Sequence, residues 1–454
     1  MKKNIDRREF LKTAASAAAV TTGVSALSSC SGKGGKTPGA AAGTSEGEMT
    51  HRINPKQGDK VSILGYGCMR WPMTKDENEK DIVDQEAVNR LVDYALENGV
   101  NYFDTAPVYL QGQSERATGN ALKRHPRENY FIATKLSNMR GNFTYDEAIA
   151  MYRKSMAELQ TDYIDYYLLH NMASEDVFNR RFKDNGVIDF LLKEREAGRI
   201  RNLGFSFHGN KEGFDSLVAL HDKYHWDFVQ IQLNYMDWNH AGQRNTNASY
   251  LQAELDKRGI PSIIMEPLLG GRLADAPDHI ADRLKEMAPE GSIASWAFRF
   301  AGSHDGVLTV LSGMTYMDHL QDNIKTYSPL VTLTDEEKAF LEEIARLRSE
   351  YQEIPCTQCQ YCMPCPYGLD IPTIFSHYNK CVNEGLINDD KEDSEYRKDR
   401  RAYLIGYDRA LPKLRQADRC ISCGICVAKC PQHISIPGEI RKIDLYVEEL
   451  RRSR

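Results

Sequence analysis

Eight of the eleven cysteines in this 454-residue chain lie between residues 356 and 430, in two short runs that each end in proline. The first run contains Cys356, Cys359, Cys362 and Cys365, and the second contains Cys420, Cys423, Cys426 and Cys430. Such short spacings place several thiol groups on one loop, whereas cysteines that only fill a core have no reason to gather in this way. The pattern therefore indicates a ligand-binding site in the C-terminal part of the chain.

The spacing within the runs indicates which ligand this is. The second run has the C-x2-C-x2-C-x3-C-P pattern of bacterial-type ferredoxins, and the first run is one residue shorter before its last cysteine. Zinc is the main alternative, because paired C-x-x-C runs also make tetrahedral sites, and a disulfide framework is the third. The additional cysteine within each run and the trailing prolines favour iron–sulfur clusters, and we expect two of the [4Fe–4S] type.

Two-cluster ferredoxins suggest how the cysteines are shared, because the fourth cysteine of each run binds the other cluster. The first expected ligand set is Cys356, Cys359, Cys362 and Cys430, and the second is Cys420, Cys423, Cys426 and Cys365. The 54 residues between the runs exceed a minimal ferredoxin and are expected to add helices. Cys381 falls in one of these helices and is not expected to be a ligand.

The N-terminus carries the features of an export signal. Residues 7–12, Arg-Arg-Glu-Phe-Leu-Lys, resemble the twin-arginine motif, except that Asp6 replaces its usual Ser or Thr. The weakly apolar residues 13–27 that follow are too short and too mild for a stable transmembrane helix. Residues 1–30 are therefore predicted to be a signal peptide, and residues 31–57 a flexible linker.

The end of the signal, Leu-Ser-Ser-Cys30, looks like a lipobox in which Cys30 becomes the lipidated first residue of the mature chain. Cleavage by an ordinary signal peptidase, with Cys30 incidental, is the alternative. We expect a periplasmic protein whose only contact with a membrane is a lipid on Cys30. Because the twin-arginine pathway exports folded proteins, clusters would be inserted first. The mild net charge of −6 gives no reason to expect nucleic acid as a partner.

Upstream of the cysteine runs, eight short apolar segments alternate with segments of helical periodicity. The predicted strands are residues 62–68, 101–105, 130–136, 164–170, 200–206, 228–234, 261–267 and 307–313. In the first helical segment, Asp84 can cap the start and Gly99 can end the helix. Eight strand–helix units predict an α/β fold, a (β/α)8 or TIM barrel over residues 58–330. A doubly wound open sheet is the competing fold, but no G-x-G-x-x-G segment opens a helix.

The barrel is expected to continue into a helical connector and then into the cysteine-containing part. The connector is predicted at residues 331–354. Residues 355–454 are predicted to form a small, α-rich ferredoxin-type domain that binds two [4Fe–4S] clusters.

Four polar residues lie at or just after the C-terminal ends of neighbouring predicted strands, where TIM barrels place their active sites. They are Asp104, Tyr109, Lys135 and His170. Hydride that reaches a carbonyl carbon leaves negative charge on the oxygen, so a proton donor must be in place. Tyrosine, with a pKa near 10, is a poor acid at neutral pH, and a nearby ammonium is expected to lower that pKa by about 1–3 pH units.

These residues resemble the tetrad of the aldo-keto reductase superfamily, and the chain as a whole resembles the subgroup with a C-terminal 4Fe–4S ferredoxin-type domain. The resemblance implies that Tyr109 is the general acid in reduction and the base in oxidation. It also implies that Lys135 activates Tyr109, that Asp104 pairs with Lys135, and that His170 orients the carbonyl group.

The same resemblance implies a nicotinamide cofactor, NADP or NAD. The residues expected to contact it are Ser206, Gln230, Ser312, Gly313 and Asn323. Phe207 stands where the family commonly has asparagine, and Met265 stands near the place of the aromatic residue that stacks on nicotinamide. Basic residues that would hold a 2′-phosphate are missing from the Ser312 segment, with His319 the nearest substitute.

The sequence predicts an exported oxidoreductase that interconverts a small-molecule carbonyl and alcohol, coupled to [4Fe–4S] clusters and to a redox partner protein. The electron counts of the two cofactors do not match, because nicotinamide transfers two electrons as hydride and each cluster transfers one. No flavin motif, which could convert between the two, is visible in the sequence. The alternative is a membrane-tethered electron-transfer protein in which the barrel is a non-catalytic docking module.

Overall fold

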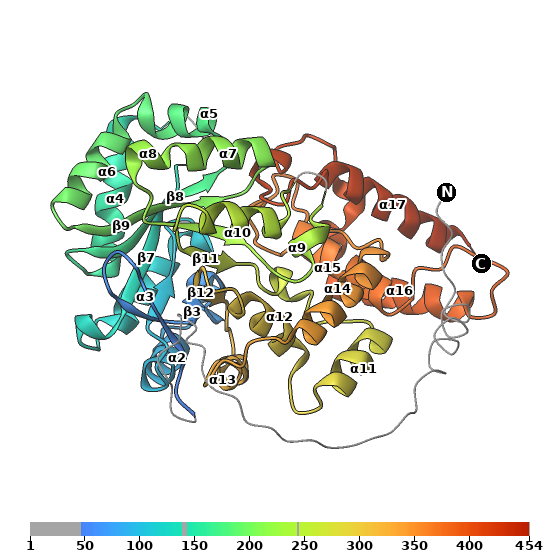
Figure 1. The fold of residues 1–454 in the computed structure, drawn as a ribbon. Helices are drawn as coiled ribbons and strands as arrows, with labels where there is room; N and C mark the ends of the chain where they lie inside the picture. The colour runs from blue at the N-terminus through green and yellow to red at the C-terminus, as the bar shows by residue number, and fades with distance from the viewer. Residues whose placement is uncertain (1–46, 139–142, 243–244, 454) are drawn as a thin grey trace, which may run out of the picture. The chain divides into compact units, whose positions relative to one another are not determined.

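The computed structural model describes residues 47–138, 143–242 and 245–453, which belong to one compact unit (Figure 1). The twin-arginine motif and Cys30 lie outside the described residues. Among the helices in the described part, none is long and apolar enough to cross a membrane.

Eight parallel strands close into a barrel in the order β10-β11-β12-β3-β6-β7-β8-β9. The strands are β3 (Leu64–Gly67), β6 (Tyr102–Asp104), β7 (Phe131–Leu136), β8 (Ile164–Met172), β9 (Ile200–Phe207), β10 (Phe228–Gln232), β11 (Ser262–Met265) and β12 (Val307–Ser312). Each strand overlaps one of the eight predicted segments, so the predicted TIM barrel is confirmed and the open sheet is not formed. Sequence-adjacent strands pair throughout, as strand–helix repeats require.

The members of one hydrophobic cluster come from the barrel strands and, in one case, from the segment just before β3. They are Val61, Tyr102, Ala133, Tyr166, Leu168, Phe228, Ile263, Leu308 and Leu311. Gly65 on β3 makes room for this layer, because a Cβ there would lie 2.7 Å from Leu311 Cδ2 and 2.8 Å from Thr309 Oγ1. The interior is therefore a packed core, and the open end of the barrel is the place for chemistry.

Helices surround the strands (Figure 1). The longer ones are α2 (Gln85–Glu97), α3 (Ser114–Leu122), α4 (Tyr145–Leu159), α6 (Val187–Glu196), α7 (Lys211–Ala219), α10 (Ala248–Asp256), α11 (Asp278–Met287), α12 (Ile293–Gly302) and α13 (Met317–Thr326). Asp84 caps α2 by accepting from the backbone N–H of Ala87, as predicted. Thr144 and Glu147 form a reciprocal capping box at the start of α4, which fixes where that helix begins.

The segment before the barrel is more ordered than the sequence suggested. Residues 31–57 were predicted to be a flexible linker, but Met49 is buried and β1 (His51–Ile53) pairs antiparallel with β2 (Lys60–Ser62). Arg52 extends this contact by donating to the carbonyl oxygen of Gly302 at 2.6 Å. Partners far along the chain stabilise this hairpin, and composition alone does not reveal them. A second hairpin joins β4 (Met73–Lys75) to β5 (Asp81–Val83).

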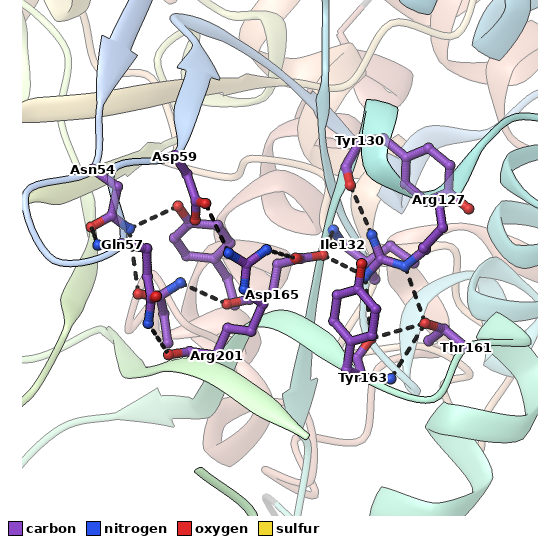
Figure 2. A network of polar contacts seen from close by, with 12 residues as sticks. Asn54, Gln57, Asp59, Arg127, Tyr130, Ile132, Thr161, Tyr163, Asp165 and Arg201 are labelled. Atoms are coloured by element: carbon purple, nitrogen blue, oxygen red, sulfur yellow. Dashed lines mark hydrogen bonds and ion pairs between the residues drawn. The ribbon is translucent and has the colours of Figure 1, made fainter. Parts of the chain in front are cut away.

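An ion-pair network centred on buried Asp165 lies where β7, β8 and β9 begin (Figure 2). Asp165 accepts from Arg127 at 2.5 Å, from Arg201 at 3.1 Å and from the backbone N–H of Ile132 at 2.9 Å. Arg201 also reaches Asp59 at 3.0 Å. Asp165 is fully buried, so these donors compensate the loss of its hydration. Because this end carries no strand-end catalytic residues, the network supports the fold.

The C-terminal part begins with α14 (Asp335–Ser349), which is the predicted connector helix and packs on the barrel core. It continues with α15 (Ile371–Asn383), α16 (Tyr396–Ala410) and α17 (Ile436–Arg452), which enclose a separate hydrophobic core (Figure 1). The helices expected between the cysteine runs are therefore present. Cys381 lies on α15, is buried in this core and has its thiol 3.5 Å from His377 Nε2.

Candidate functional site

The four residues of the predicted tetrad meet at one rim of the barrel. Asp104 ends β6, Lys135 and His170 lie near the ends of β7 and β8, and Tyr109 begins the short turn after β6. The strand register aligns them, because Asp104 pairs with Ala133 on β7 and Lys135 with Leu168 on β8. All four side chains are buried, with Tyr109 the most exposed at 9%.

Lys135 and Asp104 form a buried ion pair at the centre of the site. The Lys135 ammonium also donates to the carbonyl oxygen of Thr105 at 2.9 Å and lies 5.1 Å from the centre of the Tyr109 ring. The other oxygen of Asp104 accepts from the Gln230 side chain at 3.2 Å. Burial raises the pKa of Asp104, and the Lys135 charge opposes that rise. The pair thus holds the ammonium beside Tyr109, as the resemblance implied.

The electrostatic state of Tyr109 differs from the expectation. The pKa of Tyr109 is raised well above its usual value, first by burial and then by its interactions with the Tyr361 and Asp104 side chains. The expected lowering by Lys135 does not dominate in this geometry, because loss of water disfavours the phenolate more strongly. Tyr109 is therefore a neutral hydroxyl that holds its proton.

His170 is a neutral imidazole with a partner at each ring nitrogen. Its Nδ1 lies 2.6 Å from Ser137 Oγ, and its Nε2 lies 3.3 Å from the hydroxyl of Tyr361. Burial and the nearby Lys135 and Arg181 charges lower the pKa of His170 well below its usual value. Arg181 also donates to the carbonyl oxygen of His170 at 2.7 Å and so fixes the end of β8.

Tyr361 is the site residue that sequence reasoning missed. It lies between Cys359 and Cys362 in the first cysteine run, far along the chain from the tetrad, yet its ring is 6.2 Å from that of His170. An aromatic residue inside a cysteine loop was the available signal. That signal is weak, because the equivalent residue of the second run, Ile425, is 50% exposed.

The residues expected to contact nicotinamide fall into two groups. Ser206 and Gln230 are paired across β9 and β10, beside the tetrad. Ser206 accepts from the backbone N–H of Asn171 at 2.8 Å. At the end of β12, Asn323 donates to Ser312 Oγ at 3.0 Å. Phe207, which replaces the family's asparagine, packs its ring 4.9 Å from that of Phe214 and belongs to the core.

No disulfide joins the eight cysteines of the two runs. Charge interactions couple Cys430 to Cys356, Cys359 and Cys362, which are the members of the first expected set. Cys426 is coupled to the other members of the second set, Cys420, Cys423 and Cys365. Among the described residues, no three His, Cys, Asp or Glu side chains converge closely enough to hold a single metal ion. These interactions follow the two expected sets, except that Cys362 also interacts with Cys426. Cysteine thiolates are the ligands of iron–sulfur clusters, so the residues present fit such a group.

The cysteine loops lie against the C-terminal end of the barrel. Arg70, in the turn after β3, donates to the carbonyl oxygen of Thr357 at 2.7 Å. On the side of the second run, Gln432 donates to Gln232 at the end of β10 at 2.9 Å. Both contacts join residues next to a proposed cluster ligand to residues at strand ends.

Comparison with known proteins places this geometry in a family. Residues 63–346 match the aldo/keto reductase family, and residues 355–435 match a 4Fe-4S dicluster domain. An aldo-keto reductase of Mycolicibacterium smegmatis is 32% identical over 160 residues, covering 35% of this chain and 50% of that protein. This chain therefore spans about half the length of that relative.

Two further relatives match over most of their length. L-galactose dehydrogenase of Arabidopsis thaliana is 25% identical over 323 residues, covering 64% of this chain and 93% of that protein. The crystal structure of an aldo-keto reductase from Klebsiella pneumoniae in complex with NADPH has a TM-score of 0.52 at 19% identity, covers 66% of this chain and 95% of that one, and shows the shared fold. This chain belongs to the aldo/keto reductase family, and its barrel is followed by a 4Fe-4S ferredoxin-type domain.

Proposed function

We propose that the barrel interconverts a carbonyl group and an alcohol at its C-terminal end. The observation that carries this proposal is the buried Lys135–Asp104 pair beside Tyr109 and His170. A buried ammonium is costly unless it is paired, and this one is directed at a tyrosine that is available as a proton donor. Small-molecule carbonyls and alcohols are the proposed substrates.

Each tetrad residue has a separate task in this proposal. Tyr109 keeps its proton at rest and donates it when negative charge develops on the substrate oxygen. Lys135 then stabilises the phenolate, and Asp104 holds Lys135 in position. Neutral His170 carries one ring N–H, and its Nε2, which now faces the Tyr361 hydroxyl, would orient the carbonyl group by a hydrogen bond. In oxidation, the Tyr109 phenolate accepts the proton of the alcohol.

The proposed hydride carrier is NADP or NAD. Ser206, Gln230, Ser312, Gly313 and Asn323 would hold it, and when bound it would supply or accept the hydride. The polar side chains in this set lie on β9, β10, the end of β12 and α13, and their hydroxyl and amide groups could hydrogen-bond to a dinucleotide. The NADPH in the Klebsiella pneumoniae structure makes this the first nucleotide to test.

The C-terminal domain is proposed to bind two [4Fe–4S] clusters in the exchanged sets described above. The clusters would exchange single electrons with a redox partner protein. We further propose that the twin-arginine segment exports the folded, cluster-loaded protein to the periplasm and that Cys30 anchors it by a lipid. Substitution of both Arg7 and Arg8 by Lys should then leave the protein in the cytoplasm when cells are fractionated, with clusters still assembled.

The deciding experiment compares the anaerobically purified wild type with Tyr109→Phe, using benzaldehyde and NADPH as probes. Loss of a general acid should reduce kcat by about 10²–10⁴-fold with iron content unchanged. Tyr94→Phe, on the outer helix α2, is the matched control and should keep full activity. Equal activity of Tyr109→Phe and wild type would contradict the assigned role. Redox-active clusters beside a barrel that retains no nucleotide and turns over no carbonyl would favour the docking-module alternative.

A further inference from the structure

The hydroxyl of Tyr361 lies at the position that a substrate oxygen should take. It is 3.3 Å from His170 Nε2 and interacts with the Tyr109 hydroxyl, the same two groups that would bind and protonate a carbonyl oxygen. Its ring stands edge-on to that of His170, and the Tyr109 ring stands edge-on to His170 as well. The three side chains therefore form one closed group at the barrel rim.

The backbone of the first cysteine run, which carries Tyr361, has two residues with positive φ. Gln358 and Gln360, on either side of Cys359, have φ values of 55° and 63°. The second run has the same pattern, with 57° at Ser422 and 76° at Gly424. The two loops thus share one local conformation, and the first adopts it with glutamine where the second has glycine. A non-glycine residue with a positive φ of this size costs about 1 kcal/mol or more, so contacts made by the loop must offset that cost.

The matched position in the second loop shows that the local conformation does not itself bury the side chain. Ile425 follows Gly424 as Tyr361 follows Gln360, and Ile425 is half exposed. Tyr361 is instead partly covered and lies against His170 of the tetrad. The difference between the loops therefore lies in the barrel surface that the first loop meets.

That surface is shaped to receive the loop. Gly270, after β11, has a φ of 70°, and a Cβ there would lie 2.3 Å from the carbonyl oxygen of Thr357. The same carbonyl oxygen accepts from Arg70, whose side chain would lie 2.9 Å from a Cβ on Gly313. Residues 356–362, called the cluster loop below, and Arg70 therefore cover both the tetrad and the Gly313 segment.

We propose that the cluster loop is a lid on the reaction site and that Tyr361 is its occupying residue. In the closed position, the Tyr361 hydroxyl takes the place of the substrate oxygen between Tyr109 and His170. Substrate reaches these two residues only when the Tyr361 side chain turns away, because Cys356, Cys359 and Cys362 would hold the loop itself on the proposed first cluster. That the Tyr361 hydroxyl takes the place of a substrate oxygen rests on the proposed function. That the loop covers the site rests only on contacts within this chain.

The lid is tested first without turnover, by the rate at which diethyl pyrocarbonate modifies His170 in the cluster-loaded protein. Peptide mass spectrometry reports the modification at each histidine. In Tyr361→Ala, the rate at His170 should rise about tenfold, as expected if the site is covered in about 90% of wild-type molecules. Ile425→Ala, the matched change in the second loop, should leave that rate unchanged. His304, far from the loop, reports an intact barrel by reacting equally in all three proteins.

An equal His170 rate in wild type and Tyr361→Ala would overturn the lid, and so would an equal increase in Ile425→Ala. Because Tyr361→Ala leaves a cavity and could impair folding, Tyr361→Phe provides a second measure. It removes only the hydroxyl that competes with substrate, so the KM for benzaldehyde should fall several-fold without loss of kcat. A lower kcat at unchanged KM would overturn the occupying role. Absence of turnover in every protein would instead contradict the proposed function, while the modification rates still decide the lid.

Discussion

The hydroxyl of Tyr361 lies 3.3 Å from Nε2 of His170 and thereby joins a cysteine loop to the barrel rim that carries the tetrad. The two residues are separated by 191 positions in sequence and belong to parts of the chain with separate hydrophobic cores. Any cluster held by Cys359 and Cys362 would therefore adjoin the proposed reaction site. Two-electron hydride transfer and one-electron transfer by a cluster would then take place next to each other.

Removing the charge of Lys135 should destabilise the fold as well as abolish turnover. Lys135→Met leaves Asp104 as an unpaired buried carboxylate, which typically costs about 3–5 kcal/mol in the free energy of unfolding. Denaturant titration should show this loss, and the double variant Lys135→Met/Asp104→Asn should recover part of it. Lys211→Met, which breaks an exposed pair with Asp215, is the control and should change stability little. Equal stability of the single and double variants would contradict the pairing.

His304 should make stability depend on pH below neutrality. Burial lowers the pKa of His304 to about 4, with Lys338 and Arg52 adding to the effect and Asp305 opposing it. Between about pH 6.5 and pH 4 the unfolded chain binds a proton that the folded chain does not, so the free energy of unfolding falls as pH falls. The contribution reaches about 2 kcal/mol at pH 5.

The measurement is a set of thermal or denaturant unfolding curves at pH 7, 6 and 5. His304→Gln should have a shallower pH dependence than wild type. A slope unchanged by His304→Gln would show that this histidine does not supply the effect.

The exchanged ligand sets predict which cluster each fourth cysteine serves. Cys430→Ser should give the paramagnetic resonance spectrum of a first-run variant such as Cys359→Ser, although Cys430 belongs to the second run. Cys365→Ser should in turn resemble Cys423→Ser. Iron analysis of the wild type should give about eight atoms per chain. If Cys430→Ser resembles Cys423→Ser instead, each run holds its own cluster.

The ion-pair network around Asp165 should affect stability without affecting catalysis. Asp165→Asn weakens charged hydrogen bonds to Arg127 and Arg201, and we expect a loss of about 2–3 kcal/mol in the free energy of unfolding. The network lies at the end of the barrel opposite the tetrad, so kcat and KM of the folded protein should stay at wild-type values. A change in kcat with little change in stability would contradict this separation.

Features set by local pattern were predictable. Strand segments, the Asp84 cap and the tetrad positions follow from short-range periodicity and from the rule that polar residues at the ends of barrel strands share one rim. The cysteine runs likewise indicate iron–sulfur chemistry through spacing alone. These features could be predicted because each depends on residues that are close in sequence or on one topological rule.

Features set by packing between distant segments were not predictable. The order of residues 49–53 depends on contacts with Gly302 and the barrel base, and the raised pKa of Tyr109 depends on how completely water is excluded around it. The contact of Gln230 with Asp104 depends on side-chain direction in a closed barrel.

The sequence by itself determined that this chain has an eight-stranded barrel, a tetrad at its rim and two cysteine runs of ferredoxin type. Only the tertiary structure decided that the first cysteine run covers the tetrad and brings Tyr361 between Tyr109 and His170. The physical reason is that burial of a loop requires a complementary surface. That surface, built from Arg70, Gly270 and the strand ends, exists only after residues far apart in the sequence have folded together.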